Sequence, residues 1–217
     1  MSQVTMDTSA SGPRSGRPPV RRPKSWQQRL RESRIGTLSV LLVTAALVAG
    51  GYYLLDRPTT PRTGIQAIEL AGPNIGAPPK IGTLAQDFTA PTVAGQAVSL
   101  SSFKGRPVWL TFGATWCAAC VAEAPDVQAS YLKFQPQRAV VLAIFIREDA
   151  ATVKDYADRV GLTYPKVADP DTAIASAYRV YGIPAHFFID RKGILRDIKT
   201  GGLSPEQMSA ALTGISR

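Results

Sequence analysis

Two long, largely apolar runs separated by a helical pattern constrain the fold of this 217-residue chain most strongly. The runs are residues 108–112 and 139–146, and the second contains eight apolar residues in succession. Such runs are typical of strands that are covered on both faces of a sheet. The helical pattern between them spans residues 117–135, where Pro125 should kink the helix. This order predicts an α/β domain in which helices cover a sheet.

The remaining pattern extends this prediction on both sides. Short strands are expected at 87–89 and 97–100, followed by a helical turn at 101–104. Later segments predict a helix at 150–160, a strand at 164–168, a helix at 172–181 and a hairpin at 185–199. Ser204 as N-cap, Pro205 at the first helical position and Gln207 in a capping box begin the last helix. A mixed sheet with helices on both faces follows.

Four segments divide the chain. Residues 1–34 form a basic tail that is too poor in large apolar side chains to build a core. Residues 35–55 contain no charge and are long enough to cross a hydrocarbon core of roughly 30 Å as one transmembrane helix. Residues 56–80, rich in proline and glycine, are interpreted as a linker with one brief strand. The domain proper is expected at 81–217.

The distribution of charge predicts how the apolar segment at 35–55 is oriented in the membrane. Residues 1–55 carry 8 basic and 2 acidic groups, a net +6, which leaves only +3 of the total +9 for the rest of the chain. Basic residues on the N-terminal side predict a cytoplasmic N-terminus and an extracytoplasmic domain, which is periplasmic where an outer membrane exists. A cleaved signal peptide is the alternative, but no clean cleavage site closes the apolar stretch. The chain lacks the aromatic and basic interleaving of a nucleic-acid-binding surface.

Both cysteines of the chain lie in the sequence Trp116-Cys117-Ala118-Ala119-Cys120. This stretch follows a predicted strand and begins a predicted helix. The orphan N–H groups and the positive dipole end of a helix N-terminus stabilise a thiolate there. Thiolates in such positions have pKa values of about 3.5–7.5, against about 8.5 for a free cysteine. The spacing predicts a redox-active dithiol.

The cysteine pair has two other interpretations. A structural zinc site needs four ligands, and two cysteines with the single His186 cannot supply them. A purely structural disulfide would close so short a loop that it would constrain the unfolded chain little. Redox chemistry is therefore favoured.

A family resemblance rests on further motifs. The stretch 112–120 (Phe-Gly-Ala-Thr-Trp-Cys-Ala-Ala-Cys), then Glu-Ala-Pro at 123–125 and Gly-Ile-Pro at 182–184, resembles the thioredoxin fold. The order of anchor, linker and domain resembles the membrane-anchored TlpA/ResA-type thiol–disulfide oxidoreductases. The resemblance covers about residues 81–215. It implies a thioredoxin fold with an N-terminal strand extension and a central insert around 161–165, preceded by one transmembrane helix.

The resemblance also implies roles for five residues. Cys117 would be the exposed nucleophile and Cys120 the buried resolving thiol, with Trp116 packed beside them. Glu123 matches an acidic residue that this branch keeps near the buried cysteine for proton transfer. Pro184 matches a cis-proline that brings backbone next to the dithiol and lets a client chain add as a strand. No cofactor is expected beyond the redox-active disulfide between Cys117 and Cys120.

The sequence also departs from relatives of this kind. Thr111 stands where thioredoxin has a buried aspartate, so Glu123 is the remaining candidate for a proton relay, and burial should raise its pKa. The dipeptide Ala118-Ala119 lacks the proline that many relatives carry there, which leaves the direction of electron flow open. His186 could serve as a copper ligand or as a base, but it is interpreted as a hydrogen-bonded histidine within a strand.

The expected function is an extracytoplasmic reductase of disulfides in client proteins. The resemblance implies clients such as apocytochrome c or copper-site cysteines, and a membrane electron donor of the thiol-reductase type. A copper-binding oxidase assembly factor on the same fold is one alternative, although such proteins space their cysteines differently. A thiol peroxidase is another, although the Pro-x-x-x-Thr-x-x-Cys setting expected for it is missing.

Overall fold

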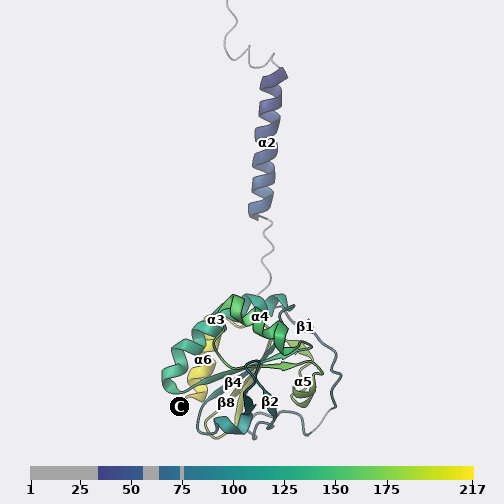
Figure 1. Cartoon of the computed structure of the whole chain (residues 1–217). Helices are drawn as coiled ribbons and strands as arrows, with labels where there is room; N and C mark the ends of the chain where they lie inside the picture. Colours follow the sequence, from purple (N-terminus) through teal and green to yellow (C-terminus); the bar gives the residue numbers. More distant parts are fainter. Residues whose placement is uncertain (1–33, 56–63, 74–75) are drawn as a thin grey trace, which may run out of the picture. The chain divides into compact units, whose positions relative to one another are not determined.

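The structure is a computed structural model that describes residues 34–55, 64–73 and 76–217. The chain divides into two compact units, residues 1–57 and 58–217, which we describe separately. The first contains helix α2 (Arg34–Leu55), over the residues where the sequence predicted a transmembrane helix (Figure 1). Within the described part of the chain, no helix is long and apolar enough to cross a membrane. The tail at 1–33 and the linker residues 56–63 and 74–75 lie outside the described residues.

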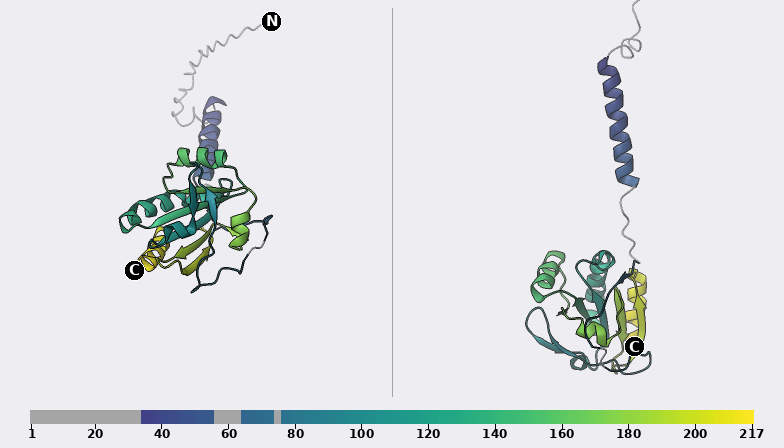
Figure 2. Two further views of the ribbon diagram at one scale, coloured as in Figure 1. Left: turned by 60° about the horizontal axis from the view of Figure 1, so that its bottom comes forward. Right: turned by 90° about the vertical axis from the view of Figure 1, so that its right-hand side faces the viewer.

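The second unit is built on a five-stranded mixed sheet with strand order β6-β5-β4-β8-β9 (Figures 1 and 2). Strands β4, β5 and β6 are parallel, and β8 and β9 run antiparallel to their neighbours. The bounds of these strands are β4 Val108–Gly113, β5 Val140–Ile146, β6 Lys166–Asp169, β8 Ala185–Ile189 and β9 Leu195–Thr200. The prediction of a mixed sheet is confirmed.

Helices cover both faces of this sheet, as predicted. They are α3 (Ala118–Phe134), α4 (Ala150–Val160), α5 (Ala173–Ala177) and α6 (Pro205–Ile215), with short 3₁₀ turns η1 (Leu100–Phe103) and η2 (Gln135–Gln137). Two apolar clusters fill the space, one with α3, α4 and α6, the other with α5 and η1. Side chains alternate along β4. Trp109 therefore joins the cluster of α3, α4 and α6, while Leu110 and Phe112 join the other.

Three elements differ from the expected bounds for local reasons. Helix α5 is shorter than the predicted 172–181 because Thr172 and Arg179, at its two ends, adopt left-handed backbone conformations. Strand β6 begins only after Pro165, which has no N–H to donate to a ladder. The N-terminal strand pair is β2 (Thr89–Pro91) with β3 (Ala97–Ser99), so Pro91 lies in a strand rather than in the turn.

Residues 65–72, part of the predicted linker, belong to the second unit. Strand β1 (Gln66–Ala67) is the brief strand expected there, and it pairs antiparallel with β7 (Gly182–Ile183). Ile68 is buried in the core, and the N–H groups of Ala71 and Gly72 donate to the Thr172 hydroxyl. This segment is therefore part of the folded unit, next to the Gly-Ile-Pro motif.

Candidate redox site

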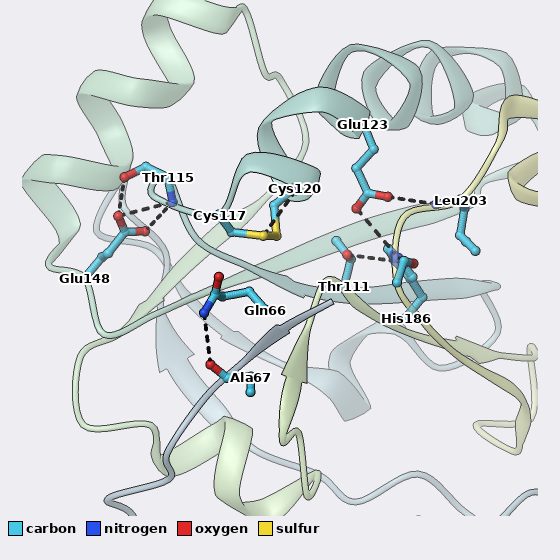
Figure 3. Close-up of a disulfide and its surroundings, with 11 residues drawn as sticks. Gln66, Ala67, Thr111, Thr115, Cys117, Cys120, Glu123, Glu148, His186 and Leu203 are labelled. Carbon is cyan, nitrogen blue, oxygen red and sulfur yellow. Dashed lines mark hydrogen bonds and ion pairs between the residues drawn. A yellow bond between two sulfur atoms is a disulfide. The ribbon is translucent and has the colours of Figure 1, made fainter. Parts of the chain in front are cut away.

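The two cysteines form a disulfide at the N-terminus of α3 (Figure 3). Cys117 is the N-cap of this helix, and its sulfur accepts a hydrogen bond from the N–H of Cys120 at 3.2 Å. This N–H is one of the orphan donors of a helix N-terminus, and the dipole adds positive potential at the same place. A thiolate at Cys117 would therefore be stabilised by the backbone itself.

The burial of the two cysteines differs from the expectation. Cys117 is only 1% exposed, whereas Cys120 is partly exposed, so the prediction of an exposed Cys117 and a buried Cys120 is wrong for this disulfide form. The Cys117 side chain turns back to cap α3 and to bond Cys120. It belongs to the apolar cluster that includes Ile68, from the segment next to β1, and Ile183 of β7. In this disulfide form, the Cys117 sulfur is therefore shielded from solvent.

A buried carboxylate holds the loop in front of Cys117. Glu148, two residues after the end of β5, accepts hydrogen bonds from the Thr115 N–H at 3.0 and 3.2 Å with its two oxygens and also from the Thr115 hydroxyl. Glu148 is only 7% exposed. No local pattern in the sequence points to Glu148, because it lies 33 positions from its partner Thr115. An acidic residue at the carboxyl end of a buried strand is the signal that could have found it.

Glu123 lies one turn after Cys120 on the same helix, so the two side chains share a face of α3. It is buried, and its Oε2 accepts the Leu203 N–H at 3.1 Å. The pKa of Glu123 is raised to about 8. Burial is the main cause, the Leu203 hydrogen bond lowers the pKa in part, and the charge of Asp126 adds a small rise. The expected rise of its pKa is confirmed.

A small cavity lies beside Cys120 and Glu123. Cys120 and Glu123 both line it, together with Thr111 and Gly113. Its volume is about 30 Å³. A water molecule needs about 10–15 Å³ measured in this way, so the cavity is large enough to hold one.

His186 lies on the other side of Glu123 (Figure 3). It is fully buried on β8, directly opposite Thr111 of β4 in the strand register. Its Nε2 is 3.6 Å from Glu123 Oε1 and 3.3 Å from the Gly201 carbonyl. The favoured interpretation of a hydrogen-bonded strand histidine fits these contacts. The sequence did not predict its proximity to Glu123.

Pro184 lies between β7 and β8, and the peptide bond from Ile183 to Pro184 is cis, as the resemblance implied. Ala185 pairs with Phe112, so the register places Pro184 beside Gly113, whose position abuts Cys120. The proline loop and the dithiol therefore meet at the same end of β4. The neighbouring edge of β7 is paired with β1.

Trp116 is 48% exposed immediately before Cys117. Its expected packing beside the cysteines stays a prediction. Among the residues that the structure describes, no group of three or more histidine, cysteine or acidic side chains is arranged to hold a metal ion.

A disulfide at a helix N-terminus, after the central strand of a five-stranded mixed sheet and beside a cis-proline, defines a thioredoxin-fold thiol–disulfide oxidoreductase. Residues 81–198 match the model of the AhpC/TSA family. The chain is 31% identical over 179 residues to the thiol–disulfide oxidoreductase ResA of Geobacillus thermodenitrificans, covering 82% of this chain and 93% of the relative. It is 30% identical over 189 residues to ResA of Geobacillus kaustophilus, covering 87% and 97%.

Solved structures agree with this. A thioredoxin-family thiol:disulfide interchange protein of Chlorobium tepidum is 26% identical with a TM-score of 0.59, covering 64% of this chain and 99% of its own. A secreted disulfide oxidoreductase of Mycobacterium tuberculosis is 25% identical with a TM-score of 0.54, covering 58% and 95%. The chain belongs to the AhpC/TSA family, and within it to the ResA-type thiol–disulfide oxidoreductases.

Proposed function

We propose that this protein reduces disulfides in client proteins outside the cytoplasm, using Cys117 as nucleophile and Cys120 as resolving thiol. The observation that carries the proposal is the position of Cys117 as N-cap of α3, bonded to Cys120, which itself lies one turn before the buried carboxyl group of Glu123. This arrangement supplies a stabilised thiolate, a second thiol within reach and a group that exchanges protons.

The proposed reaction moves two electrons from the dithiol to the client. The Cys117 thiolate attacks one sulfur of the client disulfide, which forms a mixed disulfide and releases the first client thiolate. Cys120, as a thiolate, then attacks Cys117. This step closes the Cys117–Cys120 disulfide and releases the second client thiolate, and protons from the surroundings complete the two client thiols.

Glu123 serves in the second step as the proton acceptor for Cys120. With a pKa of about 8, its carboxyl group is ionised in about one molecule in ten at pH 7. The ionised form can take the Cys120 proton, directly or through water in the shared cavity. The neutral form can return a proton when the disulfide is reduced again.

The client segment is proposed to add as a strand to β7, beside Pro184. Extended peptides bind exposed strand edges through backbone hydrogen bonds. In this disulfide form, β1 pairs with that edge, and the Ile68 N–H donates to the Tyr181 carbonyl at 3.0 Å. A client that uses β7 must therefore displace β1.

The proposed location follows from residues 35–55, which run without a charge between a basic flank and the domain. The segment would anchor the protein in the cytoplasmic membrane with its N-terminus inside. Protease digestion tests this: the domain at 81–217 should be cleaved in intact spheroplasts, and protection there, with cleavage only in inverted vesicles, would contradict it.

An extracytoplasmic reductase needs electrons from the membrane, since its disulfide must be reduced after each turnover. We propose a membrane thiol reductase as donor, and apocytochrome c or the copper-site cysteines of an oxidase as clients. A Cys120→Ser variant should accumulate mixed disulfides through Cys117, which can then be identified by mass spectrometry. A Cys117→Ser variant is the matched control and should trap none.

The reduction potential of the Cys117–Cys120 pair tests the direction of electron flow. A potential near that of thioredoxin, about −270 mV, is expected for a reductase. A potential near that of DsbA, about −120 mV, would overturn the proposed direction and indicate an oxidant. Failure of the Cys120→Ser variant to trap any protein, while Cys117 remains open to alkylation, would contradict the client mechanism.

A further inference from the structure

The ring of His186 makes polar contacts at both nitrogens in a fully buried site (Figure 3). Nδ1 lies 3.3 Å from the indole Nε1 of Trp109 and 3.0 Å from the hydroxyl of Thr111. Nε2 faces the Gly201 carbonyl and the Glu123 carboxyl group, at 3.3 and 3.6 Å. The strand register brings these side chains together. Thr111 of β4 pairs with His186 of β8, and Trp109 pairs with Phe188, which lies two residues after His186 and therefore on the same face of β8.

Trp109 decides which nitrogen of His186 carries the proton. An indole N–H can only donate, so the Nδ1 that it contacts must accept and carries no proton. The single proton of the neutral ring is therefore on Nε2, where it points to the two oxygens. Burial also keeps the ring neutral, because desolvation disfavours the charged imidazolium and lowers the pKa of His186 to about 3.

The same contact disfavours an ion pair between His186 and Glu123. The ion pair of Glu123 and His186 contains the same number of protons as the neutral pair, so the two states differ only in whether the second proton is on the carboxyl group or on the ring. In the ion pair, however, Nδ1 would carry a proton next to the Trp109 N–H, which is also a donor, so the indole would lose its acceptor and the Nδ1 proton could bond only to the Thr111 hydroxyl. Glu123 therefore keeps its own proton, and His186 can donate to it but cannot take the proton away.

We propose that His186 is a positioning residue for Glu123: its neutral Nε2–H stabilises the ionised carboxylate when Glu123 has given up its proton, and Trp109 fixes the tautomer that makes this possible. In the disulfide form, the Nε2–H donates to the Gly201 carbonyl, at 3.3 Å. The 3.6 Å between Nε2 and Glu123 Oε1 is too long for a hydrogen bond. A negative charge on the carboxylate would draw this donor closer. The proposal rests on the proposed role of Glu123 in proton transfer and adds a residue that acts through it.

Other titratable groups near the pair have defined effects. Asp126, on α3 itself, raises the pKa of Glu123. Tyr156 of α4 and Tyr164 face the same region, and burial raises the pKa of both, so they stay neutral at physiological pH. The charge of Lys199 on β9 lowers the pKa of His186 and so favours the neutral ring.

The test measures the protonation of Glu123 directly in the oxidised full-length protein. The infrared C=O band of a protonated carboxyl group is followed against pH and assigned by its loss in Glu123→Gln. His186→Leu removes the donor and should raise the pKa of Glu123 by about one unit, a tenfold change in proton affinity. His186→Gln can place an amide N–H near the Nε2 position and should restore most of the shift.

Trp109→Phe should act in the opposite direction. Without the indole N–H, Nδ1 of His186 is free to bind a proton, with the Thr111 hydroxyl turning to accept it. The pair can then become an ion pair, so the carboxyl band of Glu123 should weaken or vanish at pH 7. A residue that merely fills space would move neither the midpoint nor the band. Circular dichroism confirms that each variant is folded.

An unchanged midpoint in both His186→Leu and Trp109→Phe would overturn the proposal, and so would a lower midpoint in His186→Leu. If His186→Leu does not fold, His186→Gln and Trp109→Phe still decide it, because the first should keep the wild-type midpoint and the second should lower it. The infrared measurement needs no client. Shifted midpoints together with an unchanged pH profile of client reduction would therefore support the role of His186 while contradicting the proposed role of Glu123.

Discussion

The free energy of unfolding of the oxidised Glu123→Gln variant, relative to that of wild type, should increase as the pH rises. The ordinary pKa of this carboxyl group is 4.5, and burial in the folded protein raises it to about 8. Between these values the unfolded chain has lost the proton and the folded protein still holds it. Each increase in pH therefore favours the unfolded chain, so the stability linked to Glu123 is complete below pH 4.5 and lost by about pH 8.

The size of the effect follows from the same two values. Three pH units separate pH 5 from pH 8, and each pKa unit corresponds to about 1.4 kcal/mol. Wild-type protein should thus lose about 4 kcal/mol through Glu123 over this interval, a large share of the 5–15 kcal/mol typical of a folded protein. Glutamine cannot ionise, so the variant should lack this loss. The lowered pKa of His186 makes stability rise with pH up to about 6.5, but this contribution is present in both proteins.

Urea unfolding at pH 5, 6, 7 and 8, followed by tryptophan fluorescence without reductant, measures the difference. The free energy of unfolding of Glu123→Gln minus that of wild type should increase by about 4 kcal/mol from pH 5 to pH 8. Glu69→Gln, at an exposed carboxylate, is the control and should show no such trend. A difference that stays constant across this range would refute the raised pKa of Glu123.

Three further outcomes are expected. Glu148→Ala should cost about 1–3 kcal/mol in urea unfolding, since the Thr115 N–H loses its buried acceptor, while Glu148→Gln should cost less. The double variant Gln66→Pro and Ala67→Pro should weaken the pairing of β1 with β7 and so speed client reduction in a stopped-flow assay. An unchanged rate, or an equal acceleration by Gln66→Ala, would argue that β1 does not compete with the client. Ser204→Ala should lower the free energy of unfolding by about 1 kcal/mol through loss of the α6 cap, and an unaltered urea midpoint would contradict this.

Much of the fold could be predicted because its signals are local. The apolar runs gave β4 and β5 within one residue at each end, and the Ser204 capping box is present as expected. Gly161 ends α4 in a left-handed conformation, as a glycine after an amphipathic helix should. Each of these depends on residues within a few positions of one another. The redox pair was predictable for the same reason, since its two cysteines are three positions apart.

The sequence by itself determined the elements, their order and a dithiol at the start of a helix, together with an acidic residue one turn later. Only the tertiary structure decided what surrounds that acid. Leu203 lies 80 positions from Glu123, and His186 lies 75 positions from Thr111. Such neighbours depend on strand register and on how a helix packs across a sheet, neither of which a local pattern encodes. The inward turn of Cys117 and the pairing of β1 with β7 depend on the same long-range packing.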